Sequence, residues 1–233
     1  MSASQRPTAP QPSSASAPRA GQSTNPSISR PPLSVHPTAT ISETAYFQGK
    51  HSINIGAGTV IHPRAKILSF EGPINLGEGC IIGEKAVIGG PLPVASLTSS
   101  TTFGTDVTTI ENSVHIGPLA TINSGSHIHS AAVIESSAII GRQASIGRHA
   151  KVCALCEIPD NGNVGDWIVA WGGGAGGMGT QKRKRANGRN DDENTTGLNG
   201  RAVEVARLAV LSKERETLAK LIGAGATATS RRR

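Results

Sequence analysis

The sequence is poor in aromatic residues and in cysteine, and it lacks long apolar runs. Aromatic side chains make up 3% of the 233 residues, which suits a thin aliphatic core better than a thick globular one. No apolar stretch is long enough to span a membrane, and the Ser-, Ala- and Pro-rich N-terminus has no signal-peptide core. Three cysteines, an odd number without an export signal, favour a reducing compartment.

A six-residue repeat of branched aliphatic residues takes the place of these features. Within one repeat a small residue stands two positions before the aliphatic one, so both point to the same side of a short strand. Three strand-and-turn units close a triangular coil of about 18 residues, and the coils stack. The rungs predicted to fill the axis are Ile110, Ile116, Ile122, Ile128, Ile134, Ile140, Ile146, Val152, Ile158 and Val164.

This period predicts a mainly β fold. The expected architecture is a single-stranded parallel β-helix of hexapeptide repeats, followed by one C-terminal α-helix. A sandwich or barrel would give uneven spacings. Known β-helices with this motif are left-handed, against the usual right-handed crossover, and the hand is taken from that resemblance.

The composition divides the chain into a head, the β-helix and a C-terminal part. Residues 1–32 are a Pro/Ser-rich head, predicted to be disordered because it has little apolar surface to bury. Residues 33–171 are the β-helix, with a loop inserted at about 89–109 and two shorter insertions, at Gly49-Lys50 and at Ser69 to Pro73, placed in the corners. Trp167 and Trp171 are expected to form a lid, because solenoid ends need caps.

The C-terminal part begins with a Gly-rich, charged segment at 172–199, predicted to be a flexible linker. A helix follows at 200–223, with Asn199 as N-cap and Gly223 as terminator, and 224–233 is a basic tail. A lone helix is marginal in water, so it packs either on its own β-helix, the favoured reading, or on another chain. The apolar residues expected at that contact are Val203, Val210, Leu211, Leu218 and Leu221.

The net charge of +7 comes largely from residues outside the repeat. The Lys182–Arg185 run fits a nuclear-localisation or nucleic-acid patch, but a solvated linker is the favoured interpretation. We therefore predict no nucleic-acid partner and no direct membrane insertion.

The cysteines and histidines are the candidates for chemistry. Cys153-x-x-Cys156 has the spacing of a redox or zinc pair, but Cys156 occupies a small inward position, which favours a structural cysteine. His127 and His129 project the same way from one strand without a clear third ligand, and the His-x-x-x-x-His pair of gamma-class carbonic anhydrases is missing. His127 or His115 would be the choice for a general base, yet no Walker or Rossmann glycine pattern accompanies them. We predict no catalytic, metal-binding or cofactor-binding residues and no cofactor.

Two segments of the early coils resemble the dynactin subunit 6 family. They are Thr59-Val-Ile-His-Pro-Arg-Ala-Lys-Ile67 and Glu71-Gly-Pro-Ile-Asn-Leu-Gly-Glu-Gly-Cys-Ile-Ile82. The resemblance also covers the inserted loop, the regular ladder and the C-terminal helix, but neither the head nor the Gly-rich segment.

The resemblance implies a non-enzymatic, cytoplasmic, cytoskeleton-associated subunit. Its expected partners are the other pointed-end subunits of dynactin, namely subunit 5, subunit 4 and the actin-related subunit that ends the filament. Through them it would act indirectly with dynein and cargo adaptors in transport on microtubules. The alternative is a hexapeptide-repeat enzyme, similar to gamma-class carbonic anhydrases or acyltransferases and acting as a homotrimer, because one fold hosts many functions.

Overall fold

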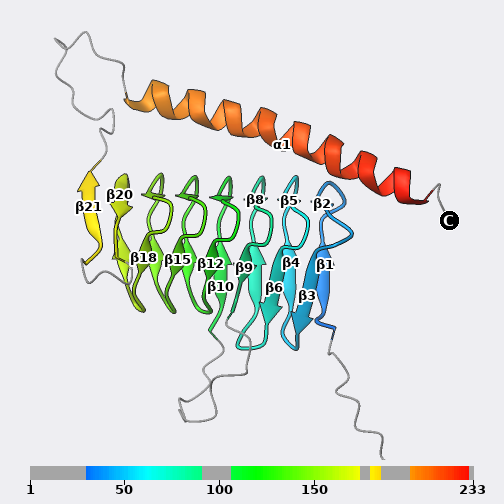
Figure 1. Ribbon diagram of the computed structural model, residues 1–233, viewed down its shortest axis with the longest axis horizontal. Coiled ribbons are helices and arrows are strands. Elements are labelled where there is room, and N and C mark those ends of the chain that lie inside the picture. Colours follow the sequence, from blue (N-terminus) through cyan, green and yellow to red (C-terminus); the bar gives the residue numbers. More distant parts are fainter. Residues whose placement is uncertain (1–29, 91–105, 174–178, 185–199, 231–233) are drawn as a thin grey trace, which may run out of the picture.

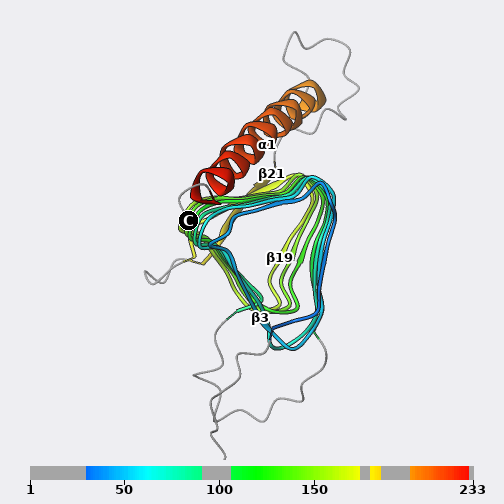
Figure 2. The ribbon, with the colours of Figure 1, turned by 90° about the vertical axis from the view of Figure 1, so that its right-hand side faces the viewer.

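The repeat folds into a triangular prism in the computed structural model, which describes residues 30–90, 106–173, 179–184 and 200–230 (Figure 1). Viewed along its axis, the stack of coils is a triangle with one sheet on each side, and the C-terminal helix lies outside it (Figure 2). The architecture is the left-handed parallel β-helix that the six-residue period predicts.

Three sheets form the sides of the prism, and each takes every third strand along the coils. The β1 sheet contains β1 (Leu33–Val35), β4 (Ile53–Ile55), β7 (Ile74–Leu76), β10 (Thr108–Ile110), β13 (His127–Ile128), β16 (Ser145–Ile146) and β19 (Asn163–Val164). The β2 sheet contains β2 (Thr40–Ile41), β5 (Val60–Ile61), β8 (Ile81–Ile82), β11 (His115–Ile116), β14 (Val133–Ile134), β17 (Lys151–Val152), β20 (Ile168–Trp171) and β21 (Gln181–Lys184). The β3 sheet contains β3 (Tyr46–Gly49), β6 (Lys66–Ser69), β9 (Val87–Ile88), β12 (Thr121–Ile122), β15 (Ile139–Ile140) and β18 (Glu157–Ile158).

The coils are regular only in the second half of the stack. From β10 onward, hydrogen-bonded partners in successive coils are 18 residues apart, as between Arg142 and Asp160. In the earlier coils the separations are 20, 21 and 34 residues. The longest one spans the inserted loop, most of which lies outside the described residues, and the ladder resumes in register at β10.

The rungs form the dry core that the period predicts. All ten, from Ile110 to Val164, are at most 1% exposed. The small positions two residues earlier are buried too, and the one hydroxyl among the regular ones, Ser126, donates to the Asn123 carbonyl oxygen at 2.7 Å. Burying an aliphatic side chain contributes about 1.5–3 kcal/mol, so the repeated rungs dominate the stability of the prism.

The corners turn through left-handed backbone conformations. Eleven residues other than glycine have positive φ, among them Leu119 at 61° and Leu155 at 59°. Each such residue costs of order 1–3 kcal/mol unless its surroundings hold it. Hydrogen bonds between stacked corners do so, for example from Leu155 N to the Ser136 carbonyl oxygen at 3.1 Å.

Gly49 fills one of the predicted longer corners. Its φ is 133°, and a Cβ there would lie 2.5 Å from the Ser69 carbonyl carbon of the next coil. The backbone N–H groups of Lys50 and His51 both donate to the Ser69 carbonyl oxygen. The extra residues therefore bulge at the corner without breaking the stack.

The C-terminal end of the prism differs from the prediction. Within the segment assigned to a flexible linker, β21 forms and pairs antiparallel with β20. Lys182 Nζ donates to the Asn163 carbonyl oxygen at 2.5 Å, which ties this strand to the last coil. The Lys182–Arg185 run is thus partly an edge strand, and lysine on an edge strand discourages pairing with other chains.

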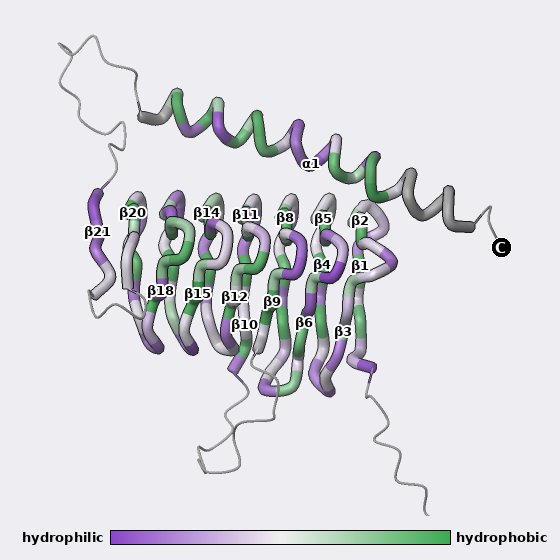
Figure 3. Tube along the Cα trace, in the orientation of Figure 1, coloured by the Kyte–Doolittle hydropathy of each residue, from purple (hydrophilic) through white to green (hydrophobic). Residues whose placement is uncertain are grey.

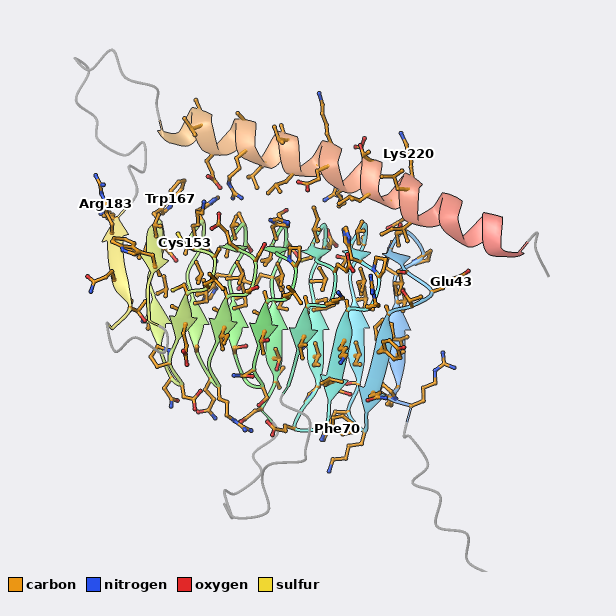
Figure 4. All side chains as sticks on the ribbon, viewed as in Figure 1. Glu43, Phe70, Cys153, Trp167, Arg183 and Lys220 are labelled. Atoms are coloured by element: carbon orange, nitrogen blue, oxygen red, sulfur yellow. The ribbon has the colours of Figure 1, made fainter. Side chains whose placement is uncertain are left out.

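The two tryptophans do not form the expected lid over the axis. Ala170 points inward and is fully buried, so its neighbour Trp171 points outward and is 40% exposed. Trp167 occupies a left-handed corner and stacks on His149 of the preceding coil, with ring centroids 4.4 Å apart. Figure 4 shows Trp167 on the side of the last coils that faces the C-terminal helix.

The helix, α1 (Gly200–Ser230), runs back along the stack over the β2 sheet and contacts β2 and β5 (Figure 1). It continues beyond Gly223, the predicted terminator. It packs on its own β-helix, which was the favoured expectation. None of the described residues forms a helix long and apolar enough to cross a bilayer.

The face of α1 that packs is not the predicted one. Leu211 and Leu218 are half-buried as expected, but Val203, Val210 and Leu221 are 45%, 64% and 65% exposed. Hydrophilic and hydrophobic residues alternate along the helix without a continuous apolar stripe (Figure 3). Polar residues that find partners on the coils set the orientation instead, as described below.

Candidate functional site

A cluster of one carboxylate and two imidazoles lies on the outer face of the β1 sheet. His127 begins β13, and His129 follows that strand on the same face. Thr109 of β10 pairs with His127, so Glu111, two residues after Thr109, lies opposite His129 in the preceding coil. The stacking of coils, not the local sequence, brings Glu111 to the two histidines.

The three side chains converge closely. Glu111 Oε1 lies 3.0 Å from His127 Nε2 and 2.9 Å from His129 Nδ1. The two rings stack with centroids 4.0 Å apart and an interplanar angle of 28°. The other carboxylate oxygen, Oε2, accepts hydrogen bonds from Ser130 N at 3.0 Å and Ser130 Oγ at 2.6 Å. These contacts fix the orientation of the carboxylate and of both rings.

The hydrogen bonds also set the charge of the cluster. The Ser130 hydroxyl, together with the Ser130 N–H and the two imidazoles, lowers the pKa of the Glu111 carboxyl to about 2, although burial acts in the opposite direction. Glu111 is therefore ionised throughout the ordinary pH range, and the cluster keeps a fixed negative charge beside two neutralisable rings.

Sequence reasoning found His127 and His129 but missed Glu111 as the third member. The signal was present, because one regular coil is 18 residues and Glu111 stands 18 residues before His129. Reading back by one coil from each histidine would have placed Thr109 and Glu111 beside the pair. Among the residues that the structure describes, this is the group of three His, Cys, Asp or Glu side chains placed closely enough to hold a metal ion.

The other candidate base, His115, lies on a different side of the prism. It belongs to β11 in the β2 sheet, beneath α1. Burial lowers the pKa of its imidazole, with Arg207 and His62 adding to the effect and Glu214 and Glu135 opposing it. His115 and His127 thus do not form one site.

The Cys153–Cys156 pair is not arranged for redox or zinc chemistry. Cys156 points into the axis and is 1% exposed, whereas Cys153 is half-buried at a corner, and both are free thiols. Burial raises the pKa of the Cys156 thiol to about 11, with the neighbouring Cys153 adding to the shift, so almost no thiolate forms near neutral pH. This supports the structural interpretation.

A second polar cluster anchors the start of α1 to the coils. Glu204, 3% exposed, receives hydrogen bonds from Arg207 Nε at 2.9 Å and from the His149 ring at 2.7 Å. Arg207 Nη2 also donates to the Ala131 carbonyl oxygen at 2.7 Å. Burial alone would raise the pKa of the Glu204 carboxyl, but the hydrogen bonds from Arg207 and His149 lower it overall.

A small cavity lies further along the same contact. It has a volume of about 210 Å³ and is lined by residues of the β2 sheet and of α1, among them His115, Leu208, Leu211 and Arg215. Arg215 Nη1 donates to the Gly79 carbonyl oxygen at 3.3 Å and closes one side of it. The cavity is a packing gap between helix and sheet, since no further titratable group converges on it within the described residues.

The geometry and the comparison with solved structures define the class of fold. A putative acetyltransferase from Bacillus cereus superposes with a TM-score of 0.59 at 14% identity, over 81% of this chain and 92% of that one. At that identity the likeness shows the hexapeptide-repeat left-handed β-helix and no activity. No family model matches the sequence.

The curated relatives are more specific but cover little of the chain. Dynactin subunit 6 of Danio rerio is 53% identical over 36 residues, which are 16% of this chain and 18% of that protein. Dynactin subunit 6 of Xenopus tropicalis is 46% identical over 44 residues, 19% of this chain and 22% of that protein. The matched segment thus spans about a fifth of the length of these relatives.

Proposed function

We propose that this protein is a non-enzymatic structural subunit of a dynactin complex, placed in its pointed-end subcomplex. The observation that carries the proposal is the local identity to dynactin subunit 6 in two vertebrates. The proposed partners are subunit 5, subunit 4 and the actin-related pointed-end subunit, in the cytoplasm on the cytoskeleton. In this role the chain supports dynein-driven transport without catalysing a reaction.

The distribution of exposed apolar side chains supports a role in protein contact. Leu119 and Leu155 stand in one column of corners, 55% and 76% exposed, separated by Ser137 of the coil between them. Ile139, two residues after Ser137, begins β15 on the β3 sheet and is 42% exposed. Grouped apolar side chains on a surface mark sites of protein association. The β3 edge therefore suits a partner better than the β2 sheet, which α1 covers.

Affinity purification of the tagged full-length chain under mild salt tests the proposal. We expect the other pointed-end subunits to be recovered with it. The double substitution Leu119→Asp and Leu155→Asp should reduce that recovery without unfolding the prism, because both side chains are exposed. Lys220→Asp, on the side of α1 that points away from the coils (Figure 4), serves as the matched control. Recovery of no dynactin subunit would overturn the proposal.

The second candidate is a hexapeptide-repeat enzyme acting as a homotrimer. The Glu111–His127–His129 cluster favours it, because imidazoles beside a fixed carboxylate are common in acid–base chemistry. The native mass separates the two candidates. A trimer that hydrates carbon dioxide or transfers an acyl group would support the enzyme, and a chain that joins other subunits without activity would support the scaffold.

A further inference from the structure

We propose that Glu111, His127 and His129 bind a divalent transition-metal ion of the zinc class on the outer face of the β1 sheet. This inference goes beyond the proposed function and does not depend on it. A structural subunit and an enzyme would each retain the site, because it is built from one chain alone.

The donor atoms already point at one place. His127 Nε2 and His129 Nδ1 approach the same carboxylate oxygen, and one donor atom from each of the three residues lies within 4.8 Å of the other two. Ligands bound to zinc at about 2.0–2.2 Å in a tetrahedral arrangement lie roughly 3.3 Å from one another. The contacts of 2.9 and 3.0 Å to Glu111 therefore need only small side-chain rotations to admit an ion.

The proton positions allow the exchange. Without an ion, each imidazole donates to Glu111 only if the facing nitrogen carries its proton. With an ion, His127 carries its proton on Nδ1 and His129 on Nε2, and the facing lone pairs bind the metal. The net change is the loss of two hydrogen bonds to Glu111 for three bonds to a cation.

The surroundings hold the ligands in position. Ser130 binds the carboxylate oxygen that does not face the rings, and outer hydrogen bonds of this kind orient metal ligands. The stacked rings restrict each other, and β10 and β13 pair in fixed register beneath them. The site thus requires little ordering when the ion arrives.

The chemistry of the donors selects the ion. Two imidazoles and one carboxylate form the three-ligand set of open zinc sites, whereas calcium and magnesium prefer oxygen donors alone. The His127, His129 and Glu111 side chains are 44%, 28% and 26% exposed, so solvent reaches the cluster and can complete the coordination. Nitrogen ligands with open positions suit Zn²⁺, Co²⁺ and their neighbours.

Titration of the full-length chain with Co²⁺ tests the proposal. The chain should carry no polyhistidine tag and should first be freed of metal with a chelator. We expect visible absorption bands typical of tetrahedral Co²⁺, saturating at one ion per chain, and displacement of Co²⁺ by Zn²⁺, which binds more tightly. His129→Ala and Glu111→Gln should each lower the affinity more than about 100-fold, and Ser130→Ala by about 10–100-fold.

Two control variants identify the source of any binding. Cys153→Ser removes the exposed thiol, and His36→Ala removes an exposed imidazole that contacts only Thr38 among the described residues. Both should bind Co²⁺ like the unchanged chain. The proposal is overturned if no bands appear at a large excess of Co²⁺, if His129→Ala binds normally, or if Cys153→Ser abolishes binding. Thermal melts without metal verify that each variant is folded, since the altered side chains lie on the surface.

Discussion

The axis of the prism and the contact between α1 and the β2 sheet are two interiors of different kinds. The axis contains aliphatic rungs that are at most 1% exposed and need no partner beyond shape. The α1 contact is held at one end by Glu204, Arg207 and His149, and only half-buried leucines accompany them. Apolar burial is non-directional, whereas a hydrogen-bonded ion pair depends on geometry. The comparison teaches that the prism should persist when the helix leaves it.

Substitution Ile134→Asp should produce the largest effect. It places a carboxylate without a partner in the dry axis, at a cost of several kcal/mol in the free energy of unfolding. Thermal or urea denaturation followed by circular dichroism measures the loss. Ile139→Asp, in the next strand but 42% exposed, is the matched control and should be much milder. Equal stability of the two variants would mean that the register is wrong.

A fall in pH should loosen α1 while the prism stays folded. Burial lowers the pKa of both His62 and His115 beneath the helix, which lie near Glu214. A group whose folded pKa is below its unfolded value of 6.5 contributes stability that is present above 6.5. That stability is lost as the pH falls through 6.5 toward the folded pKa, because the undocked state takes up the proton first. Glu204 keeps its charge in this range, since its pKa is lowered.

Hydrogen exchange checks this pH effect. After correction for intrinsic exchange, α1 amides should exchange faster at mildly acidic pH, whereas amides of β13 to β15 should not change. The substitution His115→Gln removes one titrating group and should flatten the dependence. Uniform behaviour of helix and coils would contradict the idea of two separable interiors. The charged groups that act on these two histidines are Glu84, Glu135, Arg207 and Glu214.

Substitution Lys184→Ala should produce the smallest effect. Lys184 pairs with Ile168 through the backbone at the end of β21, and its side chain is exposed. We expect a change within about 0.5 kcal/mol in the free energy of unfolding by urea denaturation. A loss above about 1 kcal/mol would mean that the side chain, not the main chain, holds β21 on the prism.

The sequence predicts the axis well because the axis obeys one period. Each rung is specified by its own residue type, so Ile110 to Val164 could be assigned without knowing any contact. The face of α1 could not be assigned this way, because Glu204 and Arg207 are buried only through His149 and the Ala131 carbonyl, more than 50 residues away. The same is true of β21, whose backbone pairs although its side chains resemble a linker.

The candidate site falls between these cases. His127 and His129 are visible as a pair, and Glu111 becomes visible once the 18-residue coil is used as a second period. That longer period describes the surface as the shorter one describes the interior. Neither period reports the Ser130 contacts, which depend on where the chain turns after β13.

The constant coil makes length and surface pattern separable in this molecule. Duplication of residues 129–146, which amount to one regular coil, would lengthen the rod by one inter-strand spacing of about 4.8 Å and leave every later residue on its side of the triangle. Insertion of a single hexapeptide would instead rotate all later residues by one side and carry His149 away from Glu204. Gain or loss of whole coils is therefore a route by which such a rod can change its reach while its lateral contacts are conserved.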